Sequence, residues 1–169
     1  MNLPIYIFSF IVTLLFTLVL SVSSVSAADI AGSKVSIRFS GNVADNTAKR
    51  IKVSDIEKVG LQQIKAFNPY EKKTDEYSGI WLNDLVQKFA KAGTTQITFS
   101  AIDDYKIEFY EHEWTKVRIL LATKVNGEYI GYKNKGPMRI VFPDYQADEK
   151  FYQKTMPKWM WMINKVNFK

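Results

Sequence analysis

Hydrophobic and polar residues alternate in several parts of the chain, which is typical of strands with one buried face. Val35, Ile37 and Phe39 alternate with charged or small polar residues over positions 34–40, so this segment is predicted to be a half-buried strand. The dipeptide Asn126-Gly127 indicates a hairpin turn. Five further segments have strand character: 96–102, 105–110, 117–123, 138–142 and 158–168.

Helical periodicity is clearest over residues 82–92, where Gly93 ends the pattern. The apolar positions of this helix follow the spacing i, i+3, i+4, i+7, i+8, and they are Leu82, Leu85, Val86, Phe89 and Ala90. Ser54 followed by Glu57 is the pattern of a capping box that opens a short helix, and residues 146–155 are predicted to form another.

The segment 67–79 contains Asn-Pro, several charges and a glycine, so a long loop is expected there. Loops of this length in compact domains often carry function. Taken together, the elements predict a single α+β domain with a mostly antiparallel or mixed sheet and a few short helices.

The N-terminus has the composition of an export signal. No charged residue occurs from Pro4 to Leu20, and the small residues Val25-Ser26-Ala27 follow, as at a signal peptidase site. We expect residues 1–27 to be a signal peptide, residues 28–169 to form the domain, and the protein to be periplasmic. A retained membrane anchor is the alternative, because no Lys or Arg precedes the apolar run and its length approaches that of a membrane span.

Composition and charge limit the chemistry further. The 169 residues include no cysteine, so no disulfide or thiolate metal ligand is available. The net charge is +6, and residues 124–169 hold nine Lys/Arg against four Asp/Glu, which indicates an anionic partner or ligand for this part of the chain. Nucleic acid is not expected as that partner, because only four of the 23 basic residues are arginine and the chain is predicted to be exported.

Six short motifs occur in a recognisable order between residues 50 and 166. They are Gly79-Ile80-Trp81-Leu82-Asn83-Asp84-Leu85-Val86, Asp103-Asp104-Tyr105, Leu121-Ala122, Asn126-Gly127, Gly136-Pro137-Met138-Arg139 continuing to Pro143, and Lys158-Trp159. In this order the chain resembles the molybdopterin-binding domain of the sulfite oxidase family, in a small secreted form that stands alone. The resemblance implies that family's α+β fold and a pocket for the organic part of its cofactor.

Departures from the family pattern change the expected activity. The loop that carries the family's molybdenum-binding cysteine reads Ala66-Phe67-Asn68-Pro69-Tyr70, and a molybdenum centre needs a soft ligand such as thiolate. Lys135 stands where the family commonly has a histidine, and Asp104 where it has a glycine. Molybdenum is therefore not expected, and the chain is more similar to cysteine-free, PruR-type pterin-binding regulatory proteins.

The resemblance to PruR-type proteins implies a non-catalytic sensor. Its ligand would be a pterin, and its partner the periplasmic domain of a membrane-bound cyclic-di-GMP enzyme, either a diguanylate cyclase or a phosphodiesterase. Two alternatives remain open: a component of a molybdopterin-dependent oxidoreductase, and an interaction module whose ancestral pocket has closed.

A pterin is a flat polar heterocycle, so its site should combine aromatic surfaces with donors and acceptors around the ring edge. A carboxylate suits the 2-amino and N3–H groups, while Arg, Lys or backbone N–H groups suit O4 and N5. The candidate ligand-binding residues are Arg139, Asp103, Asp104, Tyr105, Lys135, Lys158, Trp114, Tyr145 and Trp161.

Each candidate also has a structural interpretation. Arg139 would serve equally as a solvent-facing strand residue or an ion-pair partner, and Asp103-Asp104 as a turn pair. The lysines would be solvated charges, and Trp161 would belong to the core with Trp159. His112 lies between Glu111 and Glu113, but these three side chains alternate in direction and do not predict a metal site. No motif for nucleophilic or hydrolytic catalysis is present.

Overall fold

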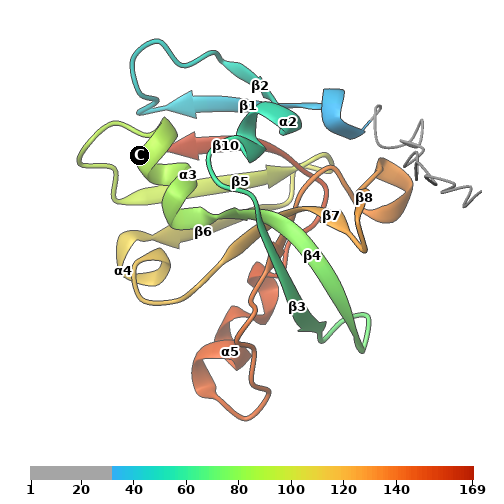
Figure 1. Ribbon diagram of the computed structural model, residues 1–169. Helices are drawn as coiled ribbons and strands as arrows, with labels where there is room; N and C mark the ends of the chain where they lie inside the picture. The colour runs from blue at the N-terminus through green and yellow to red at the C-terminus, as the bar shows by residue number, and fades with distance from the viewer. Residues whose placement is uncertain (1–31) are drawn as a thin grey trace, which may run out of the picture.

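The computed structural model describes residues 32–169 (Figure 1). The predicted signal peptide, residues 1–27, lies outside the described residues. Strands predominate, as expected, and the helices are short. The elements are β1 (Ser36–Gly41), β2 (Arg50–Lys52), α2 (Val53–Glu57), β3 (Gln62–Asn68), β4 (Lys73–Trp81), α3 (Leu82–Phe89), β5 (Gln96–Ala101), β6 (Lys106–Tyr110), α4 (Glu111–Trp114), β7 (Leu120–Val125), β8 (Glu128–Tyr129), the 3-10 turn η1 (Tyr132–Asn134), β9 (Arg139–Val141), α5 (Lys150–Thr155), the 3-10 turn η2 (Met156–Lys158) and β10 (Ile163–Phe168).

Two five-stranded sheets are formed within residues 32–169. The first sheet, called sheet A, has the order β2-β1-β10-β5-β6, with β1 and β10 parallel and the other neighbours antiparallel. The second, called sheet C, has the order β3-β4-β7-β8, and β9 also pairs with β7. The expected α+β class with mixed and antiparallel pairing is confirmed.

A single hydrophobic core joins the two sheets. In β1, Ile37 and Phe39 are buried while Arg38 between them is exposed, which confirms the alternation seen in the sequence. Phe39 contacts Phe89 of α3 and Phe168 of β10 edge to face, with ring centroids 5.1 and 5.7 Å apart. Each such large side chain contributes about 1.5–3 kcal/mol when it is fully removed from water.

Glycine is required at the bulge where β4 crosses β7. The register shifts between Ser78 and Gly79, and a Cβ atom on Gly79 would lie 2.2 Å from the carbonyl oxygen of Leu121. Packing therefore explains why the motif begins with glycine at position 79. Only glycine lets β4 approach β7 at this point and continue into α3.

The prediction of a long loop over residues 67–79 is wrong. The chain forms a hairpin there, in which β3 and β4 are antiparallel. The pairing runs from Gln62 opposite Gly79 to Asn68 opposite Lys73. Figure 1 shows this hairpin extending away from the rest of sheet C. Buried positions of the hairpin hold the polar residues Asn68 and Ser78, while Phe67 is exposed, so hydrophobicity did not indicate the strand pattern.

Two helix predictions need correction. The predicted capping box at Ser54 is not formed. The helix α2 begins directly after β2 and has no side-chain cap. The N–H of Val53 donates instead to the backbone carbonyl of Val35 (2.8 Å). The helix expected over 146–155 begins only at Lys150. The helix predicted from Leu82 is confirmed, and it ends at Phe89 because Ala90 is already extended.

The final strand is shorter than the predicted 158–168. It begins at Ile163, because Met162 adopts a left-handed conformation (φ 58°) and the N–H of Ile140 in β9 binds the carbonyl of Met160 (2.7 Å). Lys158 consequently belongs to η2 and not to the strand.

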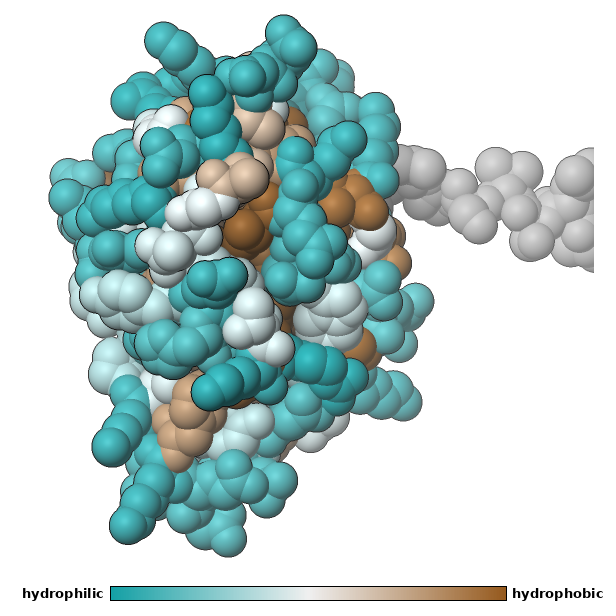
Figure 2. Space-filling model, turned by 90° about the vertical axis from the view of Figure 1, so that its left-hand side faces the viewer, coloured by the Kyte–Doolittle hydropathy of each residue, from teal (hydrophilic) through white to brown (hydrophobic). Residues whose placement is uncertain are grey.

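The side of the molecule on which α3 and α4 lie is shown in Figure 2. It is largely hydrophilic, and its hydrophobic surface is confined to small areas between polar side chains. Among the helices of residues 32–169, none is long and apolar enough to cross a membrane.

Candidate functional site

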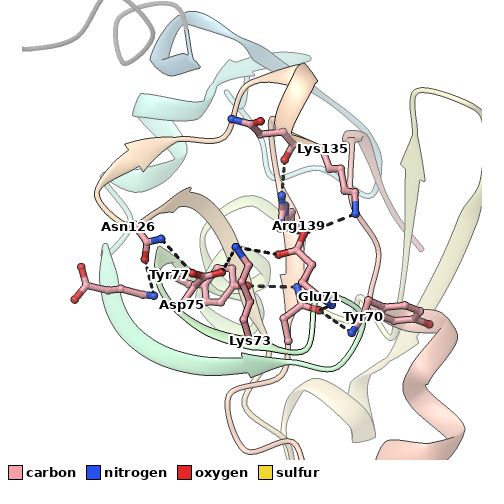
Figure 3. A network of polar contacts seen from close by, with 11 residues as sticks. Tyr70, Glu71, Lys73, Asp75, Tyr77, Asn126, Lys135 and Arg139 are labelled. Atoms are coloured by element: carbon pink, nitrogen blue, oxygen red, sulfur yellow. Dashed lines mark hydrogen bonds and ion pairs between the residues drawn. The ribbon is translucent and has the colours of Figure 1, made fainter.

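A polar and aromatic cleft lies where the turn between β3 and β4, the start of β9 and the segment before β10 meet (Figure 3). We call it the Arg139 cleft. Its central slot is narrow, about 10 Å³, which is room for about one water molecule. The residues that define the cleft are Asn68, Tyr70, Glu71, Lys135, Arg139, Trp159 and Trp161.

Arg139 is the central cation of this cleft. It is 9% exposed, and its Nη1 donates to Glu71 Oε1 at 3.1 Å. Nη2 donates to the backbone carbonyl of Asn134. Nε is buried and has no hydrogen-bond partner within the described residues. Arg139 is therefore an ion-pair residue of a buried strand, which excludes the solvent-facing interpretation.

Glu71 is the acidic residue that sequence reasoning missed. Besides Arg139, its carboxylate lies 3.7 Å from Lys135 Nζ and 3.8 Å from Lys73 Nζ. Asn68 positions it, because the Asn68 side-chain oxygen accepts from the N–H groups of Tyr70 (3.0 Å) and Glu71 (3.2 Å). Such a turn begun by asparagine was the available signal, since Asn68-Pro69 favours turn initiation.

Two tryptophans line the slot in different ways. Trp161 is 37% exposed, lies under Lys135 Nζ at 4.9 Å from its ring centroid, and contacts the Tyr70 ring edge to face at 5.7 Å. Trp159 is buried, and its Nε1 has no hydrogen-bond partner within the described residues. Two residues that line the slot therefore each carry a buried N–H donor without an acceptor in the described residues, Arg139 at Nε and Trp159 at Nε1. An unsatisfied buried donor costs about 1–3 kcal/mol.

A hollow of about 240 Å³ adjoins the slot and shares Trp161 and Tyr70 with it. Asp103 and Tyr105 also line this hollow. The hydroxyls of Tyr70 and Tyr105 donate to successive carbonyls of η2, those of Met156 (2.9 Å) and Pro157 (3.0 Å). Burial, followed by the nearby tyrosines, raises the pKa of Tyr70, so its hydroxyl remains a neutral donor.

A second and more basic hollow of about 420 Å³ shares Glu71, Lys135 and Arg139 with the slot. Lys73 and Lys133 contribute further positive charge to its lining. Gly136 holds the adjoining loop close to the protein, since a Cβ there would lie 1.7 Å from the carbonyl oxygen of Ile130. Anionic groups are the ligands that such a lining attracts.

Near the turn end of the hairpin, Asp75 contacts the turn between β7 and β8. Its carboxylate accepts from Asn126 Nδ2 (3.1 Å) and pairs with Lys73 Nζ (2.9 Å) (Figure 3). Burial alone would raise the pKa of Asp75, but the hydrogen bonds from Lys73 and Asn126 and the charges of Lys73 and Arg139 outweigh burial and lower it. Burial also raises the pKa of Tyr77, whose hydroxyl lies 3.4 Å from Asn68 Nδ2.

The structure brings five of the nine predicted site residues to the cleft and its hollows: Arg139, Lys135, Trp161, Asp103 and Tyr105. Asp103 also has the predicted turn role, because its carboxylate accepts from the N–H of Tyr105 (3.1 Å). Asp104 is adjacent but points to an exposed contact with Lys165 at 3.4 Å.

The other three predicted residues lie elsewhere. Lys158 Nζ is held 2.5 Å from Glu113 and lies over the Phe109 ring, and Trp114 is buried beside a separate hollow of about 250 Å³. Tyr145 packs between Trp159 and Phe67. These positions are explained by packing and ion pairing.

His112 is exposed and stacks on Tyr110, as expected for a surface residue. Within residues 32–169, no group of three or more His, Asp or Glu side chains is arranged to hold a metal ion.

The residues of the cleft fit the organic part of a molybdopterin better than its metal. Two buried donors without acceptors suit the ring nitrogen and oxygen acceptors of a pterin. In the segment that would carry the metal-binding cysteine, Ala66 is buried in β3 and Asn68 lines the slot. A thiolate ligand for molybdenum is absent from the whole sequence.

Comparison with known proteins agrees with this geometry. Residues 30–166 match the model of the oxidoreductase molybdopterin-binding domain. Among solved structures, the chain is similar to the sulfane dehydrogenase SoxCD from Paracoccus pantotrophus, with 14% identity and a TM-score of 0.57. The match covers 81% of this chain and 38% of that chain, and it supports the fold alone. No curated protein matches the chain. The fold expected from the spaced motifs is confirmed, and the chain belongs to the oxidoreductase molybdopterin-binding domain family.

Proposed function

We propose that this protein binds a pterin in the Arg139 cleft and carries out no redox chemistry of its own. The observation that supports the proposal most strongly is that two residues lining one slot, Arg139 and Trp159, each have a buried N–H donor, Nε and Nε1, without an acceptor in the described residues. A heterocycle with ring nitrogen and carbonyl acceptors would satisfy both.

The slot must widen to admit a ring. Tyr70 and Trp161 separate it from the 240 Å³ hollow, and both are partly exposed, so their movement sacrifices little packing. In the widened cleft, the aromatic rings would stack on the pterin, and the carboxylate of Asp103 would accept from its 2-amino and N3–H groups.

Regulation of a membrane partner is the second part of the proposal. The resemblance to PruR-type proteins suggests an exported protein that acts on the periplasmic domain of a membrane-bound cyclic-di-GMP enzyme. Ligand would control this partner only if the filled and empty forms bind it with different affinities. The β3–β4 turn is the element suited to respond, because it carries Tyr70 and Glu71 into the cleft.

Calorimetric titration with reduced and oxidised pterins tests the binding. We expect Arg139→Lys to weaken binding by about 10- to 100-fold, because it keeps the charge but loses the guanidinium fork and its Nε–H. Arg118→Lys is the matched control, since Arg118 pairs with Asp144 outside the cleft. Absence of pterin binding to the parent chain would contradict the proposal and favour an interaction module with a closed pocket.

Family membership also supports an oxidoreductase component that carries intact molybdopterin. Elemental analysis of protein purified from its own host distinguishes the two functions. Molybdenum near one atom per chain would favour the oxidoreductase, whereas pterin without molybdenum would favour the binding protein.

A further inference from the structure

The outer face of sheet A carries a row of positive charges that the Arg139 cleft does not involve. The sheet registers place one residue of each strand directly opposite the next across all five strands. At about 4.8 Å between strands, this row spans roughly 19 Å. From β2 to β6, the row consists of Arg50, Arg38, Lys165, Ser100 and Lys106.

Like charges directly opposite each other destabilise a sheet. Arg38 has Arg50 on one side and Lys165 on the other, so it makes two such pairs. Arg38 and Arg50 are both exposed, and neither forms an ion pair within the described residues. Folding alone gives no reason for this arrangement.

The acidic residues of this face lie at its opposite edge. Asp104 follows β5 and pairs with Lys165 (3.4 Å), while Glu108 in β6 pairs with Lys169 (3.3 Å). Within residues 32–169, no carboxylate pairs with Arg38 or Arg50. The two arginines line a hollow of about 750 Å³ at the end of β1 and β2. Asp45 also lines this hollow, but its side chain is 86% exposed and pairs with Lys91 (2.8 Å).

We propose that the outer face of sheet A is a docking surface for a second protein with an acidic, flat surface. Arginine suits such a partner, because its planar fork binds carboxylates in a bidentate manner. In the middle of the face, Thr98 and Ser100 are buried and uncharged, so the charged side chains of the row are the groups that a partner would meet first. This inference does not depend on pterin binding.

Other occupants fit the face less well. Residues 1–31 contain one charged side chain, Asp29, so the chain's own N-terminal segment cannot neutralise the row. A second copy carries the same net charge of +6. A lipid surface would favour exposed apolar side chains for insertion, yet Tyr110 alone among the exposed large hydrophobics of residues 32–169 belongs to a strand of this sheet.

Chemical-shift mapping with a decaglutamate peptide tests the location of the surface. We expect the perturbed backbone amides to cluster in β1, β2 and β10 around Arg38, Arg50 and Lys165. Perturbations centred on the Arg139 cleft, or scattered over all basic residues, would overturn the proposal.

Charge reversal tests the contribution of the arginines. The double variant Arg38→Glu/Arg50→Glu should lose at least tenfold in affinity for the labelled peptide by fluorescence anisotropy at low salt. The matched control is Lys88→Glu/Lys154→Glu, which makes the same charge change at exposed lysines of α3 and α5 and should lose less than threefold. Equal losses in both variants would contradict a defined surface.

A parallel titration with phosphatidylglycerol vesicles distinguishes a protein partner from a membrane. Tighter binding to vesicles than to the peptide, abolished by the same arginine variants, would overturn the proposal in favour of a lipid surface. Weak vesicle binding that does not depend on Arg38 and Arg50 would support it.

Thermal unfolding provides a readout that does not need a ligand. Arg38→Glu replaces two like-charge pairs by two opposite-charge pairs, so we expect Tm to rise by about 2 °C at low salt. A fall in Tm would show that Arg38 stabilises the fold, and would remove the argument that the row is retained for binding.

Discussion

Two basic regions of this molecule are built on opposite principles. In the Arg139 cleft, three cations converge on the single carboxylate of Glu71: Arg139 at 3.1 Å, Lys135 at 3.7 Å and Lys73 at 3.8 Å. On the outer face of sheet A, Arg38 and Arg50 lie opposite each other and neither pairs with a carboxylate in the described part of the chain.

The difference concerns what each region can recognise. Cations held by an internal acid, of which Arg139 is also buried, offer fixed donor directions, which suit a small polar ligand. Exposed cations without internal partners produce a field that extends into solvent, which suits a large charged surface. Net charge alone does not distinguish these two functions.

The largest expected contrast is in stability. Arg139→Ala should lower the free energy of unfolding by about 2 kcal/mol, because it leaves Glu71 partly buried beside fewer cations, while Arg38→Ala should change it by less than about 0.5 kcal/mol. Urea denaturation of both variants measures this. Equal effects would mean that the two regions do not differ in the way described.

The second-largest expected difference is in how ligand affinity at the two regions depends on salt concentration. Between 50 and 300 mM NaCl, we expect decaglutamate affinity for the outer face to fall at least tenfold and pterin affinity for the cleft to change less than about threefold, because screening acts most strongly on exposed charges. Titrations of the parent chain at four salt concentrations give both slopes. A pterin affinity that falls as steeply as peptide affinity would indicate an exposed site.

Trp159→Phe tests the buried donor within the cleft. Removal of Nε1–H should weaken pterin binding by about tenfold, the value of one hydrogen bond of ~1.4 kcal/mol. Stability without ligand should fall by only about 1 kcal/mol, because loss of ring volume is partly offset by removal of an unsatisfied donor. Unchanged pterin affinity would show that Nε1 does not contact the ligand.

The smallest expected effect is the pH response of the hairpin. The pKa of Asp75 is lowered in the folded protein, so its carboxylate stabilises the fold fully above its ordinary pKa of about 3.9 and loses this effect as the pH falls through the lowered value. Asp75→Asn should therefore destabilise more at pH 7 than at pH 3.

Asp148→Asn is the control for this comparison, because Asp148 is exposed and forms no ion pair in the described residues. It should have little effect at either pH. An Asp75→Asn effect that does not change with pH would show that the carboxylate charge is not involved.

Sequence patterns predicted the interior of the molecule well. Alternation located β1, strand-like composition located β5, β6 and β9, and helical periodicity located α3, because the hydrophobic residues of these segments are buried. The β3–β4 hairpin was missed because polar residues such as Asn68 and Ser78 occupy buried positions and Phe67 an exposed one, so hydrophobicity does not report burial there.

The cleft was only partly predictable for a related reason. Arg139 was identified from its place in a motif, but its partner Glu71 lies 68 residues earlier in the chain. The spacing of residues within a motif does not reveal which distant segments lie side by side, so the contact between these two side chains could not be predicted. Lys158 was singled out from its place in a motif and Trp114 as an aromatic residue for stacking. Lys158 instead contacts Glu113 and Phe109, and Trp114 is buried at the end of α4.

The position of β10 has a consequence for the biogenesis of this protein. Residues 163–168 leave the ribosome after the other strands of residues 32–169, yet they occupy the centre of sheet A between β1 and β5. A nascent chain that lacks them cannot join the two halves of that sheet, and its core remains open until translation has passed this point. Late closure of this kind would suit the export that we propose, because the chain would still be unfolded when it reached a translocation channel.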